Sequence, residues 1–137
     1  MKKQSKNIET VYQLSPLQQG ILFHSLMDSE LGVYVVQLSY TIQGPLQPEL
    51  LQKAWQQVMD RHGVMRTLFL WQRQPQPLQV VCRQIALPWQ VLDWRELESE
   101  QQQQRLQQWL QQDRQQGFVL ERTLLMRLTL IQLDKQR

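Results

Sequence analysis

The sequence predicts an α/β fold, a mixed-sheet sandwich with helices packed on it, because segments of helical and strand periodicity alternate along its 137 residues. Three observations carry this prediction. A helix-start pattern occupies residues 15–18, apolar and polar residues alternate over 33–43, and apolar residues occupy both faces of 123–133. The length suits one domain or one lobe of a larger domain.

The first predicted element is a helix that begins after Ser15. Serine can cap its N-terminus, Pro16 suits the first helical position, and Gln18 can complete a capping box. The apolar residues that follow cover more than one side of the helix: Leu17, Ile21, Leu22, Phe23, Leu26 and Met27. We therefore expect a largely buried helix.

A strand and a second helix are predicted next. Residues 33–43 alternate strictly, and Gly44 with Pro45 ends the strand. One face of this strand is apolar: Val36, Leu38, Tyr40 and Ile42. Pro48 then opens a helix whose apolar stripe includes Trp55 and Met59, and which we expect to end near residues 62–63.

The middle of the chain predicts a β-hairpin, a short strand and an exposed helix. Residues 67–71 and 78–82 have strand character and are joined by a polar loop with two prolines, and 89–92 form a further short strand. The glutamine-rich stretch 101–116 carries Leu106, Trp109 and Leu110 at helical spacing, so it predicts an amphipathic helix that ends at Gly117. A low-complexity segment without fixed structure is the alternative.

The last predicted element is a central strand over residues 123–133. Apolar side chains fall on both of its faces, which is typical of a strand buried on both sides. Residues 134–137 are similar to the start of a turn. We therefore expect a hairpin partner to follow Arg137.

Composition and charge exclude several classes of protein. A hydrophobic content of 42% supports a packed core, and no apolar run has the length of a membrane span or follows the basic N-terminus as in a signal peptide. Cys82 is the single cysteine, which excludes an internal disulfide, and a cytoplasmic location is expected. The net charge of +3 comes from scattered basic residues, which argues against nucleic-acid binding.

General catalytic motifs do not reveal an active site. His24 and His62 have no further ligand at metal-binding spacing. His24 fits a core or rim position better than a metal site, and His62 fits a helix end, where an imidazole can pair with the last carbonyl groups. Cys82 lies beside Val80 and Val81 and fits the core better than a nucleophile. The sequence contains no nucleophile elbow and no glycine-rich phosphate loop.

Two longer stretches carry a family resemblance. Residues 14–24 read Leu-Ser-Pro-Leu-Gln-Gln-Gly-Ile-Leu-Phe-His, and residues 61–69 read Arg-His-Gly-Val-Met-Arg-Thr-Leu-Phe. They resemble the first two core motifs of nonribosomal peptide synthetase condensation domains, L-S-P-x-Q-x-G-x-L-F-H and R-H-E-x-L-R-T-x-F. Gly63 and Met65 depart from the second motif. Weaker similarities occur in family order over 87–95, 113–120 and 125–128.

The resemblance implies a chloramphenicol-acetyltransferase-like N-terminal lobe. Residues 1–10 would be a short lead and 11–137 the lobe, truncated before the family's H-H-x-x-x-D-G motif. The family joins carrier-protein-bound donor and acceptor thioesters through an amide bond in peptide natural-product biosynthesis. The parent domain is therefore expected to be an amide-bond-forming transferase, and the fragment, with no catalytic residue of its own, is expected to be inactive.

The resemblance also assigns roles to residues of this chain. Arg66 is expected to pair with the aspartate of H-H-x-x-x-D-G and to hold that loop in shape, with Arg61 in a similar supporting role. Ser15, Gln18 and His24 belong to the first core motif, whose helix is expected to pack at the floor of the lobe or tunnel. No metal ligand is assigned.

Partners are implied by the same resemblance. No cofactor would bind this chain directly, because 4′-phosphopantetheine is carried by the donor and acceptor peptidyl carrier proteins. The other expected partners are the C-terminal lobe, a downstream adenylation domain and, since the first motif lies close to Met1, an upstream synthetase acting in trans. Nucleic acid and membrane are not among them. The first motif is similar to the form found with D-configured donors. The alternative is a non-catalytic lobe that recruits carrier proteins or partner enzymes.

Overall fold

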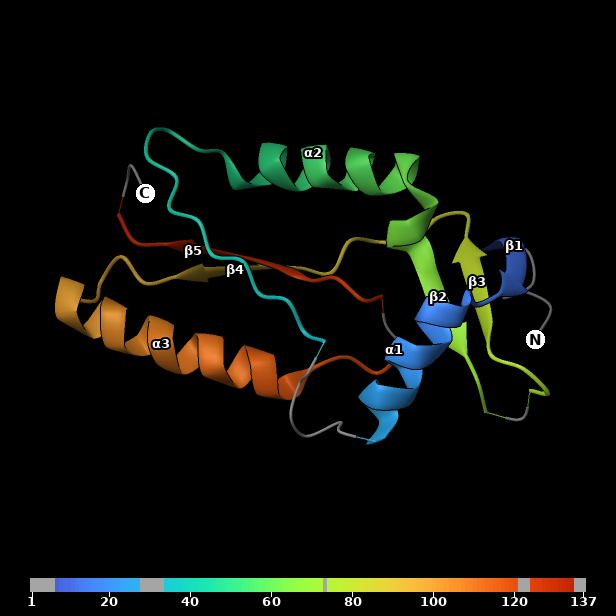
Figure 1. Cartoon of the computed structure of the whole chain (residues 1–137). Helices are drawn as coiled ribbons and strands as arrows, with labels where there is room; N and C mark the ends of the chain where they lie inside the picture. The colour runs from blue at the N-terminus through green and yellow to red at the C-terminus, as the bar shows by residue number, and fades with distance from the viewer. Residues whose placement is uncertain (1–6, 28–33, 73, 121–123, 135–137) are drawn as a thin grey trace.

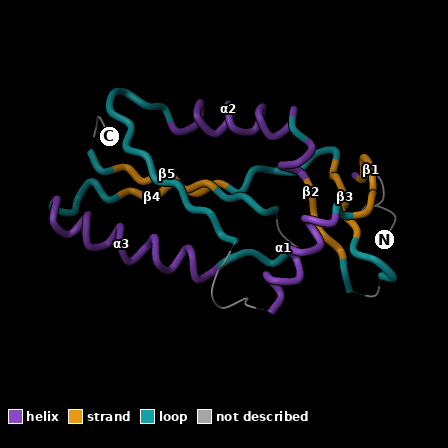
Figure 2. Tube along the Cα trace, in the orientation of Figure 1, coloured by secondary structure: helices purple, strands orange, loops and turns teal. Residues whose placement is uncertain are grey.

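The computed structural model describes residues 7–27, 34–72, 74–120 and 124–134 (Figure 1, Figure 2). These residues form both helices and strands, with the strands gathered into two sheets, so the predicted α/β class is confirmed. The elements in chain order are β1 (Ile8–Gln13), α1 (Pro16–Met27), α2 (Pro48–Arg61), the 3₁₀ helix Gly63–Arg66, β2 (Thr67–Leu70), β3 (Leu78–Cys82), β4 (Trp89–Asp93), α3 (Ser99–Gln116) and β5 (Leu128–Gln132).

The first sheet has three antiparallel strands in the order β1-β3-β2. The predicted hairpin is confirmed, because β2 and β3 pair from Thr67 opposite Val81 to Leu70 opposite Leu78. β1 pairs along the other edge of β3, from Ile8 opposite Cys82, with an irregularity between Ile8 and Thr10. β3 lies between the other two strands and is consequently the most buried of the three.

The second sheet consists of β4 and β5, which run parallel with Trp89 opposite Leu128 and Asp93 opposite Gln132. The short strand predicted over 89–92 is therefore confirmed. Figure 1 shows α2 and α3 on opposite sides of this pair, so the sheet is covered by a helix on each face.

The core lies where α2 meets the two sheets. Its buried centre consists of Met59, Leu87 and Leu124. Partly buried apolar residues surround that centre: Trp55, Met65, Leu68, Ile85, Trp89, Met126 and Leu128. The side chain of Gln56 enters this region without loss of hydrogen bonding, because it donates to Ile85 O and accepts from Leu87 N.

The predicted helix boundaries are largely confirmed by hydrogen bonds at the helix ends. At the start of α1, Ser15 N donates to Gln18 Oε1 (2.8 Å) and Gln18 N donates to Ser15 Oγ (3.2 Å), which is the expected capping box. α3 ends at Gly117, whose φ of +56° suits glycine. None of the helices in the described part of the chain combines the length and hydropathy of a membrane span.

The expectation that α1 is largely buried is wrong. Leu22 is its buried residue, whereas Leu17 is 75% exposed and Phe23 is 59% exposed. The helix contacts the remaining described residues along one side, and its sequence is apolar on more than that side. An apolar surface on α1 is therefore open in this structure.

The strand predicted over residues 33–43 is also not formed. Residue 33 lies outside the described residues, and 35–43 form neither helix nor strand; Figure 2 shows them as a loop that runs lengthwise beside β4 and β5. Alternation fixes which side chains share a face, but a strand also needs a neighbouring backbone at hydrogen-bonding distance. We call residues 35–43 the extended segment; its apolar residue Val36 is 82% exposed and Tyr40 is 79% exposed.

The predicted central strand over 123–133 is shorter than expected. Residues 121–123 lie outside the described residues, and β5 covers Leu128–Gln132. Its side chains are half-buried rather than buried on both faces, because β5 has a strand neighbour on the β4 side alone among the described residues. Residues 1–6 of the lead expected at 1–10 lie outside the described residues, and so do residues 135–137 of the expected turn.

Replacement of Met59 tests where the core lies. Met59 is 0% exposed, so Met59→Ala should lower the free energy of unfolding by about 2–5 kcal/mol through lost burial and a cavity. The matched control is Met27→Ala, since Met27 is 67% exposed and its loss should change stability by no more than about 0.5 kcal/mol. Urea denaturation measures both, and equal effects would contradict this assignment of the core.

Candidate functional site

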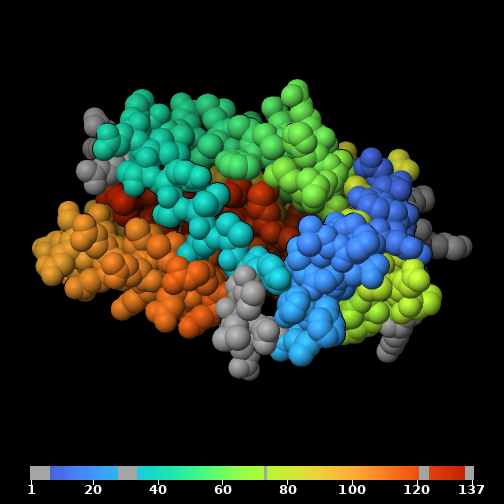
Figure 3. Space-filling view, in the orientation of Figure 1, coloured from blue at the N-terminus to red at the C-terminus, as the bar shows by residue number. Residues whose placement is uncertain are grey.

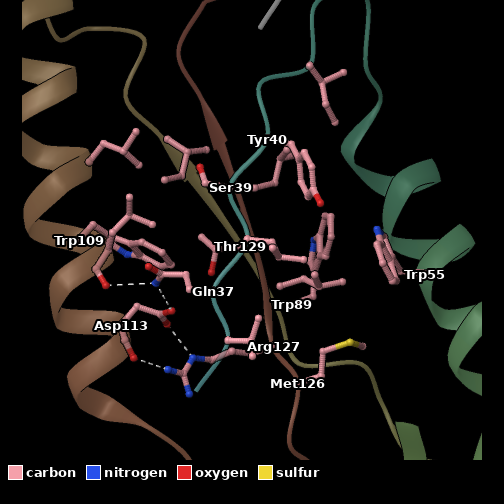
Figure 4. Close-up of a pocket in the computed structure, with 18 of the residues that line it drawn as sticks. Gln37, Ser39, Tyr40, Trp55, Trp89, Trp109, Asp113, Met126, Arg127 and Thr129 are labelled. Atoms are coloured by element: carbon pink, nitrogen blue, oxygen red, sulfur yellow. Dashed lines mark hydrogen bonds and ion pairs between the residues drawn. The ribbon is translucent and has the colours of Figure 1, made fainter. Parts of the chain in front are cut away.

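A cavity of about 390 Å³ separates β5 from the extended segment (Figure 4). We call it the β5 cavity. One wall is the consecutive run 35–42 and the other is the consecutive run 125–131. Successive side chains of a strand-like chain point to opposite faces, yet consecutive residues line each wall. The cavity is therefore bordered by the backbone edges of two segments rather than by the side chains of one face. Apolar residues of the two helices flank it: Leu51 and Trp55 of α2, and Leu106, Trp109 and Leu110 of α3.

A polar network connects the two walls of the β5 cavity to α3. Gln37 Nε2 donates to Asp113 Oδ2 (2.8 Å) and to Leu110 O (3.1 Å), and Arg114 Nη1 donates to Gln37 Oε1 (3.0 Å). From the opposite wall, Arg127 Nε donates to Asp113 Oδ1 (2.7 Å), as Figure 4 shows. Asp113 therefore joins the extended segment to the residues that lead into β5.

Arg127 also closes the C-terminal end of α3. Its Nη2 donates to Asp113 O (2.6 Å), its Nη1 donates to Gly117 O (2.5 Å), and its guanidinium lies 4.5 Å from the centre of the Phe118 ring. A cation at this end of a helix satisfies its last carbonyl groups and favours the helix dipole. The Arg127 and Asp113 side chains are 21% and 18% exposed, so their ion pair is largely shielded from solvent.

Arg66, the predicted supporting residue, is buried in the 3₁₀ helix after α2. Its Nε donates to Met59 O (3.0 Å), and its Nη1 donates to Cys82 O, to Arg83 O (3.3 Å) and to Glu9 Oε2 (2.8 Å). The guanidinium thus ties α2 to the ends of β1 and β3. Its pairing with an aspartate of the H-H-x-x-x-D-G motif stays a prediction, because that motif is not part of this chain.

Gly63, which replaces the usual glutamate of the second motif, lies next to Arg66. A Cβ atom added at Gly63 would be 3.8 Å from Arg66 Nη2 and 3.4 Å from Val81 Cγ1. The site of the second motif's usual glutamate therefore adjoins the guanidinium, and in this chain the carboxylate beside Arg66 comes from Glu9 instead. Arg61, the second supporting candidate, is exposed at the last position of α2 and does not share this burial.

The first-motif residues lie at the other end of β3. The side-chain amides of Gln18 and Gln79 bond to each other, and Gln79 Nε2 also donates to Gln13 O (3.2 Å). Ser15 acts as the cap of α1, as its capping box shows. Gln18 and Ser25 border a second cavity of about 640 Å³, between α1, the end of β2 and residues 117–120. We call it the α1 cavity.

His24 is exposed rather than packed in the core. Its ring lies 5.8 Å from that of Phe23 and 6.4 Å from that of Tyr34, centre to centre. Of the core or rim position expected for His24, the core position is wrong, and so is the expected burial of α1, because the helix contacts its neighbours along one side. Within the described residues, no three His, Cys, Asp or Glu side chains gather in a potential metal site.

Cys82 is buried at the end of β3, as its apolar neighbours predict. Burial raises the pKa of the Cys82 thiol, and the nearby positive charge of Arg66 offsets part of that shift. A buried thiol with a raised pKa is a poor nucleophile at neutral pH. The structure therefore assigns Cys82 to the core.

Sequence reasoning missed the polar residues that organise the walls of the β5 cavity. Gln37 is one of several polar residues in an alternating segment, and nothing in the alternation distinguishes it. Asp113 and Arg127 fall in the family-like stretches, but their sequence positions do not reveal them as partners. An arginine within the apolar run 124–131 was the available signal, because a charged side chain there requires a partner when it is buried.

Solved structures define the class of fold. A four-domain nonribosomal peptide synthetase, solved with AMP and glycine bound, matches 94% of this chain with a TM-score of 0.79 at 16% sequence identity; the match covers 10% of that protein. The starter condensation domain of the rhizomide synthetase matches 93% of this chain with a TM-score of 0.74 at 24% identity, and 32% of that domain is covered. The predicted fold is therefore confirmed.

The chain belongs to the condensation domain family, whose model matches residues 8–137. Its curated relatives include a linear gramicidin synthase of Brevibacillus parabrevis, 45% identical over 96% of this chain, and a plipastatin synthase of Bacillus subtilis (strain 168), 38% identical over 93%. This chain spans 2% and 4% of the lengths of these two relatives. Relatives named as synthases do not favour the alternative of a non-catalytic recruitment lobe.

Replacement of the two motif arginines compares a buried and an exposed guanidinium. Arg66→Ala should destabilise the protein by about 3 kcal/mol, because buried carbonyl groups such as Cys82 O lose their donor. Arg61→Ala is the matched control and should change stability by no more than about 0.5 kcal/mol. Thermal and urea denaturation measure the difference, and an Arg66→Ala protein of wild-type stability would rule out the structural role.

Loss of Arg127 should release the extended segment as well as weaken α3. Arg127→Met removes the partner of Asp113, so we expect a loss of about 2 kcal/mol in stability and faster chymotryptic cleavage within residues 35–43. Arg105→Met is the control, since Arg105 is an exposed arginine of α3 whose guanidinium lies over the Trp94 ring, outside this network. Limited proteolysis reads the segment directly, and unchanged cleavage in Arg127→Met would contradict the connection.

Proposed function

We propose that the full-length protein forms an amide bond between donor and acceptor thioesters carried by peptidyl carrier proteins. The observation that carries this proposal is the condensation-domain match over residues 8–137, which includes both motif stretches. Curated relatives named for gramicidin and plipastatin synthesis support a peptide product. Because the chain spans between 2% and 4% of those relatives, the rest of the machinery lies outside it.

In this proposal the chain supplies the scaffold of the site and no group that reacts. The histidine of H-H-x-x-x-D-G would act on the acceptor amine, either as a base or by positioning it. Arg66 would hold the aspartate of that motif, and its burial among main-chain carbonyls supports a structural rather than a chemical role. The 137 residues alone would then be inactive.

The expected partners remain part of the proposal. Donor and acceptor carrier proteins would present their 4′-phosphopantetheine arms, and an adenylation domain downstream would select the amino acid, in the cytoplasm. The C-terminal lobe of the same domain would cover the open apolar side of α1. Support for this contact comes from the exposure of Leu17 (75%) and Met27 (67%) on the helix that borders the α1 cavity.

Reconstitution of the intact module tests the reaction. Donor and acceptor carrier proteins loaded with aminoacyl groups should yield an acceptor-bound amide that mass spectrometry detects, and a reaction without the acceptor carrier is the control. The form of the first motif favours D-configured donors, so a D-terminated donor should react faster than its L-epimer. Absence of any amide from a folded, correctly loaded module would overturn the proposed activity, and equal rates would remove the donor preference alone.

A further inference from the structure

We propose that Glu9 is a positioning residue for the condensation reaction, because its carboxylate holds the Arg66 guanidinium in place of the glutamate usual at position 63. Glu9 itself would touch no substrate and no reacting group. The inference deepens the proposed function, and its effect on the reaction rate rests on that function. The contact between a carboxylate and Arg66 does not depend on it.

Contacts reach the Arg66 guanidinium from three elements. Its Nε donates to Met59 O near the end of α2, and its Nη1 donates to the carbonyl groups of Cys82 and Arg83 at the end of β3. From β1, the Glu9 carboxylate accepts a charge-assisted bond from Nη1 (2.8 Å). Without Glu9, Nη1 would be held from the end of β3 alone. The guanidinium plane would then be free to tilt, and Nη2 would no longer point in a fixed direction toward the aspartate that Arg66 is proposed to hold.

A β-bulge in β1 aims Glu9 at the guanidinium. Ile8 lies opposite Cys82, and Thr10 lies opposite Val81. Two steps along β1 therefore match one step along β3, and Glu9 is the extra residue. A bulge changes the direction of a side chain relative to the regular alternation of a strand, and bulges are frequent beside active sites. Here the bulge falls at the end of β3, so the Glu9 carboxylate meets the guanidinium where that group also bonds to Cys82 O.

The backbone before the bulge is fixed by the residues that follow β3. Arg83 N donates to Asn7 O (2.6 Å), and Arg83 Nε donates to Ile8 O (3.1 Å). The Asn7 side chain donates to Gln84 O (2.8 Å) and accepts from Gln84 N (3.0 Å). The place of the Glu9 backbone therefore does not depend on the ion pair, although its carboxylate is half exposed. Figure 3 shows the dark blue β1 region at the surface, beside the green end of α2.

Position 63 offers a second route to the same guanidinium. A Cβ atom at Gly63 would lie 3.8 Å from Arg66 Nη2, within reach of a glutamate carboxylate, and 3.4 Å from Val81 Cγ1, an ordinary contact. Gly63 begins the 3₁₀ helix and does not have a positive φ, so a side chain there adds no backbone strain. A glutamate at this position would bond to Nη2, whereas Glu9 bonds to Nη1. Either position is consequently able to supply the carboxylate that holds the guanidinium.

Moving the carboxylate from position 9 to position 63 tests the inference in the intact module. Glu9→Gln should lower kcat for amide formation about 10-fold, because the group that holds the catalytic loop is misplaced. KM and the urea denaturation midpoint should stay nearly unchanged, because a half-exposed ion pair adds little to stability. Addition of Gly63→Glu to Glu9→Gln should restore most of the lost kcat. Addition of Gly63→Gln is the matched control, since it brings the same bulk without the charge and should leave kcat low.

Two further measurements separate position from charge and from turnover. Glu49→Gln removes a carboxylate from an exposed site in the first turn of α2, outside the contacts of Arg66, and should leave kcat at the wild-type value. A crystal structure of the complete condensation domain with Glu9→Gln and Gly63→Glu needs no substrate. The carboxylate introduced at position 63 should lie within about 3 Å of Arg66 Nη2.

Several outcomes would overturn the proposal. A Glu9→Gln module with wild-type kcat would show that Glu9 does not position Arg66, and a loss of kcat that follows a loss of stability would assign Glu9 to folding alone. Equal kcat values with Gly63→Glu and Gly63→Gln, or an introduced carboxylate that points to solvent, would refute the shared role of the two positions. If the wild-type module forms no amide, the proposed function fails, while the crystal structure still decides whether a carboxylate at position 63 takes the place of Glu9.

Discussion

A β-strand offers hydrogen-bonding groups to two neighbours, and in β5 the described part of the chain satisfies those on one edge. Residues 128, 130 and 132 bond toward β4, and the alternate residues face the β5 cavity. This constraint explains several features together. It accounts for the half-burial of β5, and the extended segment and apolar groups of α2 and α3 border the cavity at the same edge.

Two arginines hold the surrounding elements in place, and they do so in the same way. Arg66 donates to main-chain carbonyls of residues 59, 82 and 83, and Arg127 donates to those of residues 113 and 117. Each also pairs with one carboxylate, Glu9 or Asp113. Most of the stabilisation should come from the carbonyl contacts around Arg66, because Glu9 is half exposed and solvent screens that ion pair. Their geometry suits a scaffold that positions chemistry supplied by other residues.

Much of the fold could be predicted from the sequence because its signals are local. Residues close together in the chain determine the capping box of Ser15 and Gln18, the start of α2 at Pro48 and the end of α3 at Gly117. The same holds for the hairpin of β2 and β3. The two motif stretches likewise indicated the family, which the match over residues 8–137 confirms. The roles assigned to Arg66 and Arg61 remain predictions, although burial already separates the two residues.

The sequence by itself determined the class of fold, the periodicity of each segment and the family to which the chain belongs. Tertiary structure decided which periodic segments become strands and which apolar faces are buried. Alternation over 33–43 specified an extended backbone, but ladder formation depends on a neighbour at hydrogen-bonding distance, and that information is not local. The same reason explains α1, whose apolar composition predicted burial while contacts along one side left Leu17 and Phe23 exposed. It also explains Gln37, whose partners in α3 lie more than 70 positions away.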